Sequence, residues 1–172
     1  MNLSYSDFEL FGLPQRFAQD DGAIAERWKA LQREAHPDRF AAQGASAQRA
    51  ALQWSVRINE AYQRLKDPLR RAAYLCELLG APIEAQSNTA MPADFLMEQM
   101  EWREALDDAQ GEDALEELSD RVLARRRELL ARVAQLLDVA GDAPAAAQQV
   151  RALMFVERFA GDVESRLAQL GQ

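Results

Sequence analysis

The stretch Leu31-Gln-Arg-Glu-Ala-His-Pro-Asp-Arg-Phe40 separates two segments with helical patterns. One of these segments stops inside the stretch, and the other begins shortly after it. It contains His36, the only histidine in 172 residues, followed by Pro37 and Asp38. Proline disfavours helical backbone at the preceding residue, so we expect a helix to end near Ala35 or His36. We expect Asp38 to accept a hydrogen bond from a nearby backbone amide and hold the turn. An ordinary helix end followed by a loop can also contain this tripeptide, so its function has to be inferred from the segments on either side.

The segment before the tripeptide, residues 20–35, is expected to be a helix. Four apolar residues recur in it at helical spacing and predict a buried stripe, which consists of Ile24, Trp28, Leu31 and Ala35. Three basic residues lie off this stripe or along its margins: Arg27, Lys29 and Arg33. The pattern therefore predicts a helix that buries Trp28 and presents a basic surface ending at His36.

Three more helices are expected in the first 80 residues. A short one over residues 6–11 starts at a capping Ser6 or Asp7 and is closed by Gly12. A long one follows the tripeptide and runs to about Lys66, with an apolar stripe made of Trp54, Ile58, Ala61 and Leu65. Another begins at Pro68 and ends at Gly80. Because the two long helices have a short connection, we expect them to pack as an antiparallel pair.

The remainder of the chain is expected to be a connector and a second helical domain. Residues 81–91 contain proline and a polar run, which is typical of a link between domains. Helical patterns then cover residues 92–109, 113–138 and 144–170, and no segment has the alternation of a strand. The sequence therefore predicts an all-α protein with domains at residues 1–80 and 92–172, the second an antiparallel three-helix bundle.

Composition and charge exclude several classes of function. Hydrophobic residues make up 48% and charged residues 28% of the chain, as in soluble globular proteins. We find no apolar run of about 18 residues and no apolar signal core at the N-terminus, so we expect no membrane partner and a cytoplasmic location. Residues 1–75 hold eleven Lys/Arg against nine Asp/Glu, whereas residues 76–172 hold nine against nineteen. A nucleic-acid partner is not expected, because a phosphate backbone requires a dominant cationic surface.

Metal and redox chemistry have few candidate residues. The single cysteine, Cys76, lies in the apolar run Tyr74-Leu-Cys-Glu-Leu-Leu79, where a small buried side chain is the expected role. With only one cysteine and one histidine, the chain lacks the ligands of a typical zinc or iron–sulfur site. We therefore expect no metal and no cofactor, and no internal disulfide.

The helix over residues 92–109 has two apolar faces, although a three-helix bundle buries only one. On a helical wheel one face, taken as the core face, consists of Phe95, Trp102 and Leu106. A second, nearly opposite face consists of Leu96, Met97 and Met100, and three acidic residues continue it: Glu101, Glu104 and Asp108. On the last helix, Phe155 is also expected to point away from the inward stripe.

Two interpretations of the second face remain open. Its apolar residues could pack against the N-terminal domain or the connector. Alternatively they form a partner surface, since exposed apolar patches rich in methionine commonly mark one. Metal ligation by the three acidic residues is disfavoured, because carboxylates along a helix are usually solvated.

The order of these elements resembles a J-domain, the module that stimulates DnaK-class chaperones. Over nearly its whole length the chain is more specifically similar to the HscB family of J-type co-chaperones of iron–sulfur cluster assembly. The stretches that carry the resemblance are Phe8-Glu-Leu-Phe-Gly-Leu-Pro14, the Leu31–Phe40 stretch, Ile58-Asn-Glu-Ala-Tyr62 and Phe95-Leu-Met-Glu-Gln-Met-Glu101. The chain departs from general J-proteins, since it has no Gly/Phe-rich linker and no cysteine-rich zinc module. Arg39 stands where the family often has lysine; both are charged, but their hydrogen-bond geometry differs.

The resemblance implies two binding surfaces and no catalytic residue. An HscA-type DnaK-family ATPase would bind the first, which comprises Arg27, Lys29, Arg33, His36, Pro37, Asp38 and Arg39. The iron–sulfur scaffold protein IscU would bind the second, which comprises Leu96, Met97, Met100, Glu101, Glu104, Asp108 and Phe155. Two alternatives stay open: a general J-domain co-chaperone with a different client at the bundle, and an enzyme that uses His36 as a base.

Overall fold

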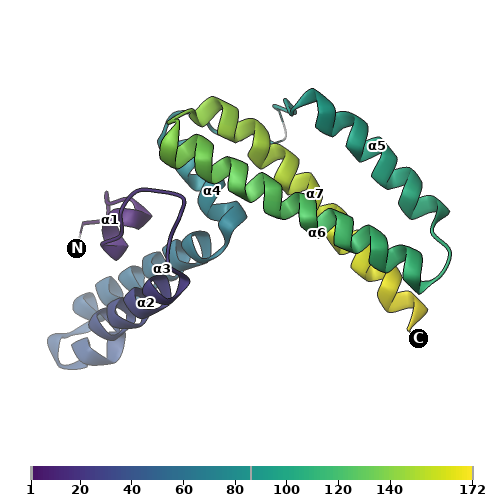
Figure 1. Ribbon diagram of the computed structural model, residues 1–172. Coiled ribbons are helices and arrows are strands. Elements are labelled where there is room, and N and C mark those ends of the chain that lie inside the picture. The colour runs from purple at the N-terminus through teal and green to yellow at the C-terminus, as the bar shows by residue number, and fades with distance from the viewer. Residues whose placement is uncertain (1, 86, 172) are drawn as a thin grey trace. The chain divides into compact units, whose positions relative to one another are not determined.

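The computed structural model describes residues 2–85 and 87–171, so Gln86 of the expected connector lies outside the described part (Figure 1). The described residues form helices and loops without a strand, which confirms the all-α class. The elements, in chain order, are α1 (Asp7–Phe11), α2 (Asp21–Ala35), the 3₁₀ helix η1 (Pro37–Gln43), α3 (Ala45–Lys66), α4 (Pro68–Leu78), α5 (Ala93–Asp108), α6 (Glu112–Ala134), the π-helical turn η2 (Gln135–Val139) and α7 (Ala143–Leu170).

The chain folds as two compact units, Met1–Leu75 and Cys76–Gln172. The boundary falls within α4, earlier in the chain than the expected end of the first domain at residue 80. The expected connector is held against the second unit. Buried Arg151 of α7 donates hydrogen bonds to the carbonyl oxygens of Ile83, at 3.0 Å, and Ala90, at 3.1 Å.

In the first unit, α2 and α3 lie side by side as the expected pair, and α1 packs against both (Figure 1). A buried carboxylate joins α1 to α3, since Asp7 is fully buried and pairs with Arg57 at 2.8 Å and Arg64 at 2.6 Å. Because two guanidinium groups neutralise this carboxylate, the ion pairs offset the free-energy cost of burying it. Trp28 is half-buried rather than buried: its ring stacks on Tyr62 at 4.6 Å between centroids.

In the second unit, α6 and α7 pack along their length, and α5 lies beside them (Figure 1). Four aromatic rings fix α5 to α7: Phe95 and Trp102 contact Phe155, and Trp102 also contacts Phe159. The ring centroids lie 5.6–6.5 Å apart, in the range where aromatic pairs attract each other. Arg125 of α6 also holds α5, because its guanidinium pairs with Glu98 at 3.0 Å.

The lone cysteine has a structural role in the second unit. Cys76 is fully buried, which confirms the expectation of a small apolar side chain. Burial raises the pKa of its thiol to about 11, so the thiol stays protonated at neutral pH. A protonated, buried thiol is neither a nucleophile nor a good metal ligand.

Candidate functional site

His36 lies on the surface, immediately after α2 ends at Ala35 as expected. Its side chain is 57% exposed, and Pro37 begins the 3₁₀ helix η1. The hydrogen bond that holds the turn runs opposite to the expected direction: the backbone N–H of Asp38 donates to Nδ1 of His36 at 3.2 Å. The Asp38 carboxylate lies 3.6 Å from the same nitrogen and is 91% exposed. Because Nδ1 accepts this hydrogen bond, the other ring nitrogen of the exposed His36 can donate to a partner, and the exposed Asp38 carboxylate can accept from a cationic one.

The four basic residues expected near this turn differ in how firmly the fold holds them. Lys29 and Arg33 are exposed on α2, as expected. Arg27 is also exposed, but its Nε donates to the carbonyl oxygen of Phe11 at 2.7 Å. Arg39 donates from Nη1 to the carbonyl oxygen of Arg33 at 3.1 Å, which ties η1 back to α2. The tripeptide therefore sits beside a basic surface, of which Arg27 is also a structural part.

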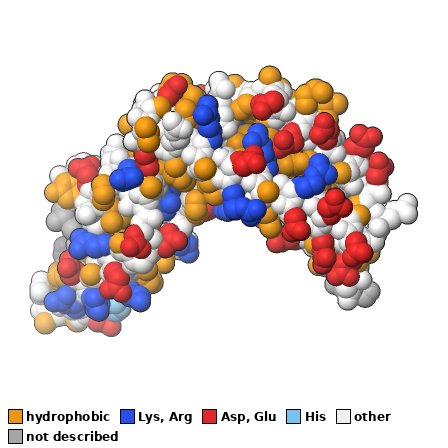
Figure 2. Space-filling view, in the orientation of Figure 1, with side chains coloured by type: hydrophobic (Ala, Val, Ile, Leu, Met, Phe, Trp, Pro, Cys, Tyr) orange, Lys and Arg blue, Asp and Glu red, His pale blue; other side chains and the backbone are white. Residues whose placement is uncertain are grey.

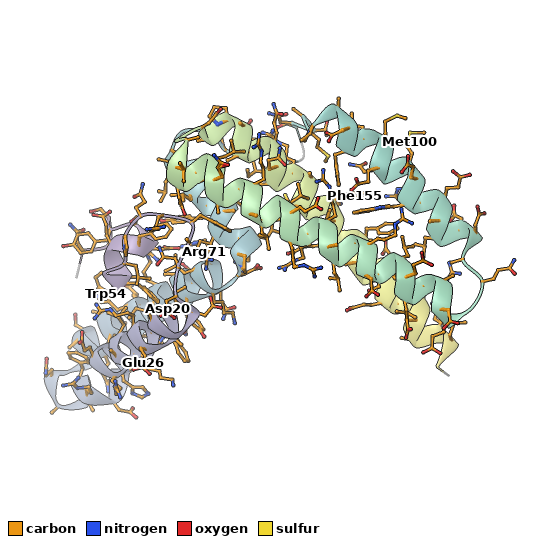
Figure 3. The ribbon with its side chains drawn as sticks, in the orientation of Figure 1. Asp20, Glu26, Trp54, Arg71, Met100 and Phe155 are labelled. Carbon is orange, nitrogen blue, oxygen red and sulfur yellow. The ribbon has the colours of Figure 1, made fainter. Side chains whose placement is uncertain are left out.

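The apolar face of α5 is exposed. Leu96 is 50%, Met97 65% and Met100 71% exposed, whereas Phe95 and Trp102 on the opposite face are buried. The expected acidic extension, made of Glu101, Glu104 and Asp108, is exposed as well. In Figure 3 the labelled Met100 points away from the bundle. These six residues, called the α5 patch below, form an apolar surface edged by carboxylates, the combination that commonly binds a protein partner.

The expected exposure of Phe155 is wrong. This residue is only 7% exposed and lies between α7 and α5, where its ring contacts Phe95 and Trp102 (Figure 3). The physical reason is that α7 is covered by two helices, α6 and α5, and therefore buries a wider arc than one stripe. Phe155 and Phe159, four residues apart, form a second apolar stripe that the sequence already contained.

Two side chains that position α5 were not identified from the sequence. Glu98 pairs with Arg125, whose guanidinium carbon also lies 5.7 Å from the centre of the Phe95 ring. The spacing of Glu98 from Phe95 and Trp102 places it at the border of the core face, which was the available signal. A charged residue at such a border often contacts the neighbouring helix.

Charge is distributed unevenly over the surface. In the view of Figure 2, Lys and Arg side chains gather over the first unit, and Asp and Glu side chains gather where α5 leads into α6. Within residues 2–85 and 87–171, no three or more His, Cys, Asp or Glu side chains are grouped so that they could hold a metal ion. None of the helices in the same residues has the length and apolar character needed to cross a bilayer.

Comparison with known proteins agrees with this architecture. The family model described as the HSCB C-terminal oligomerisation domain matches residues 91–164. A curated relative from Burkholderia mallei (strain SAVP1), a "Co-chaperone protein HscB homolog", is 47% identical over 99% of this chain and 98% of its own length.

Solved structures give the same result. Chaperone HscB from Vibrio cholerae superposes with a TM-score of 0.82 at 39% identity, over 96% of this chain and 99% of that one. The crystal structure of human co-chaperone protein HscB superposes with a TM-score of 0.89 at 26% identity, over 96% of this chain and 84% of that one. Since both the sequence and the fold match over nearly the whole length, the chain belongs to the HscB family of co-chaperones.

Proposed function

We propose that this co-chaperone stimulates ATP hydrolysis by an HscA-type DnaK-family chaperone and delivers the iron–sulfur scaffold protein IscU to it. The protein carries out no chemistry itself in this proposal. It acts in the cytoplasm, where it aids the maturation of iron–sulfur proteins.

The chaperone would bind the His36 turn and the basic surface of α2. His36 and Asp38 are exposed, and their known contacts are with each other, so both are available to a partner. Asp38 offers a carboxylate to a partner arginine, and Lys29 and Arg33 offer positive charge to partner carboxylates. The Asp38 carboxylate lies 3.6 Å from the His36 ring, but the two side chains are 91% and 57% exposed. Such an exposed pair on a proline-fixed turn favours recognition over catalysis, because water screens the interaction between the two groups.

The scaffold would bind the α5 patch. The exposure of Leu96, Met97 and Met100 on a helix whose opposite face is buried is the observation that carries the proposal. Burying three such side chains against a partner removes apolar area from water, at about 25 cal/mol per Å². The carboxylates of Glu101, Glu104 and Asp108 edge this surface and would select for basic groups on the partner.

Because both surfaces belong to one chain, a single co-chaperone can bind the scaffold and the chaperone at the same time. When the scaffold is bound at α5 and the chaperone at the His36 turn, the second encounter becomes intramolecular, and the effective concentration of scaffold near the chaperone rises. This gain requires no new contact between the scaffold and the chaperone.

Steady-state ATP hydrolysis by the cognate chaperone tests the proposal. This protein and IscU should each be added separately and then together, and we expect a larger stimulation from the pair than from the two separate effects combined. Stimulation by this protein without any further effect of IscU would instead support a general J-domain co-chaperone with another client. No stimulation in any mixture would refute the chaperone partnership.

A further inference from the structure

A cleft of about 310 Å³ opens beside α5, on the flank where that helix meets α7. Arg103 of α5 and Arg158 of α7 line it, with Asp162 one turn further along α7. Phe155 and Phe159 contribute the apolar part of its wall. The guanidinium carbon of Arg103 lies 5.3 Å from the centre of the Phe155 ring, which holds this cation at the cleft.

Neither arginine of this cleft is paired with an acidic side chain of residues 2–85 or 87–171. Within the described residues, the side chains of Arg103 and Arg158 form neither an ion pair nor a hydrogen bond. On the other flank of α5, Arg125 is neutralised by Glu98 at 3.0 Å and Glu128 at 3.1 Å. The cleft therefore keeps two positive charges against one negative, in the half of the chain where Asp and Glu outnumber Lys and Arg.

The cleft is continuous with the α5 patch. At 100° per residue, Arg103 lies within about 60° of both Leu96 and Met100 on the α5 wheel. Arg103 is one turn beyond Met100 and two turns beyond Leu96, so its side chain borders theirs on the helix surface. A partner that covers these two apolar residues therefore also reaches the mouth of the cleft.

We propose that this cleft receives an acidic side chain, glutamate or aspartate, of the scaffold protein bound at the α5 patch. The carboxylate would lie between the guanidinium groups of Arg103 and Arg158, and its aliphatic stem would lie along Phe155. Guanidinium groups bind carboxylates in a planar, two-point geometry that an ammonium group does not reproduce. The inference rests on the proposed function, because it takes the scaffold to be the partner on α5.

This pocket would add specificity to the apolar contact. The other charges of the patch, Glu101, Glu104 and Asp108, select for basic partner groups, whereas the cleft selects for an acidic one. A partner must then present both signs of charge in one order around an apolar centre, which fixes the register in which it binds.

Calorimetry of the full-length protein with purified IscU tests the pocket. We expect Arg158→Glu to weaken the affinity about tenfold, since one favourable charge contact becomes a repulsive one. We expect Arg158→Lys to retain only part of the wild-type affinity, because lysine keeps the charge but loses the two-point geometry. Arg127→Glu, at an exposed arginine of α6 that does not line the cleft, is the matched control and should bind like the wild type.

A charge exchange identifies the occupant. Exposed Asp and Glu residues of IscU are changed singly to Lys, and each variant is titrated against Arg158→Glu; one of them should restore binding. Thermal unfolding of Arg158→Glu should match the wild type, since Arg158 is exposed and its side chain has no hydrogen bond or ion pair in the described part of the chain.

The outcomes separate the two proposals. Equal affinities of the wild type, Arg158→Glu and Arg127→Glu would overturn the acidic pocket and leave the proposed function intact. Failure of the wild-type protein to bind IscU would overturn the proposed function, and the pocket with it. Equal weakening by Arg158→Glu and Arg127→Glu would show a long-range charge effect, which also overturns the pocket.

Discussion

The turn after α2 and the exposed face of α5 are both partner surfaces in our proposal, but they are built differently. The turn is polar, and hydrogen bonds between residues a few positions apart hold it. The backbone N–H of Asp38 donates to the ring of His36, and the guanidinium of Arg39 donates to the carbonyl oxygen of Arg33. The α5 face is apolar, and its orientation depends on aromatic contacts between α5 and α7, far apart in the sequence.

This difference has a consequence for mutagenesis. A change at His36 or Asp38 should alter recognition and leave the packing of the helices untouched, because these two side chains are exposed and contact each other only within the turn. A change on α5 has either effect, depending on which face of the helix it meets.

Replacement of the lone histidine should have the largest effect. We expect His36→Gln to abolish stimulation of the chaperone ATPase, because glutamine keeps polarity but not the shape and hydrogen-bonding pattern of the imidazole. Its thermal unfolding should be unchanged, because the side chain is 57% exposed and bonds only within the turn. ATP turnover measured beside a melting curve checks both expectations, and near-normal stimulation by a folded variant would contradict the role of the turn.

Truncation of Phe155 should act on stability. This ring packs against Phe95, Trp102 and Phe159, so we expect Phe155→Ala to lower the free energy of unfolding by about 3 kcal/mol. Urea unfolding followed by circular dichroism gives this quantity directly. A loss of scaffold affinity with no loss of stability would show that Phe155 belongs to the partner surface after all.

The opposite face of α5 should give the reverse result. The triple variant Leu96→Ala/Met97→Ala/Met100→Ala should lose scaffold affinity, at roughly 1 kcal/mol or more for each side chain that is a hot spot. Its melting temperature should stay close to native, since these three side chains are half or more exposed. Stimulation of the chaperone in the absence of scaffold should also persist. A collapse of melting would mean that the patch is part of the core.

The sequence predicted the helix ends well, because the chemistry that sets them is local. Ser6 caps α1 and forms the reciprocal bond with Glu9, and Pro68 begins α4 as expected. Gly80, which follows α4, has a φ of 82°, a backbone conformation that side chains disfavour. Each of these depends on residues within a few positions, so no knowledge of packing was needed.

The failures concern residues whose surroundings are set by distant segments. Phe155 was misplaced because its burial depends on where α5 lies against α7. Trp28 was expected to be buried, yet it remains half-buried while its Nε1 donates to Asn59 of α3 at 2.9 Å. The exposed face of α5 was predicted because it follows from the wheel alone, whereas the arginines of the neighbouring cleft come from two helices and became visible only in the fold.

The smallest expected effect separates two basic residues of α2 that look equivalent in the sequence. Arg33 is exposed, and its side chain forms no hydrogen bond or ion pair with the residues that the structure describes. Arg27 instead donates to the carbonyl oxygen of Phe11 and packs over Gly12. We expect Arg33→Glu to weaken chaperone binding by a few-fold, in line with about 0.2–1 kcal/mol for an exposed charge pair, and to leave melting unchanged.

Arg27→Glu should weaken binding to a similar extent and also lower the melting temperature, because the carbonyl oxygen of Phe11 loses its guanidinium donor. Surface charges are screened over about 10 Å at 0.1 M salt. Added salt should therefore reduce the affinity of the wild type for the chaperone, and with it the difference in affinity between the wild type and both variants. The melting difference between the variants should survive the salt, since the Arg27 contact is a hydrogen bond within the fold. Equal melting temperatures of Arg27→Glu and Arg33→Glu would show that Arg27 has no structural role. Chaperone binding that does not respond to salt would instead show that the basic surface of α2 is not part of the interface.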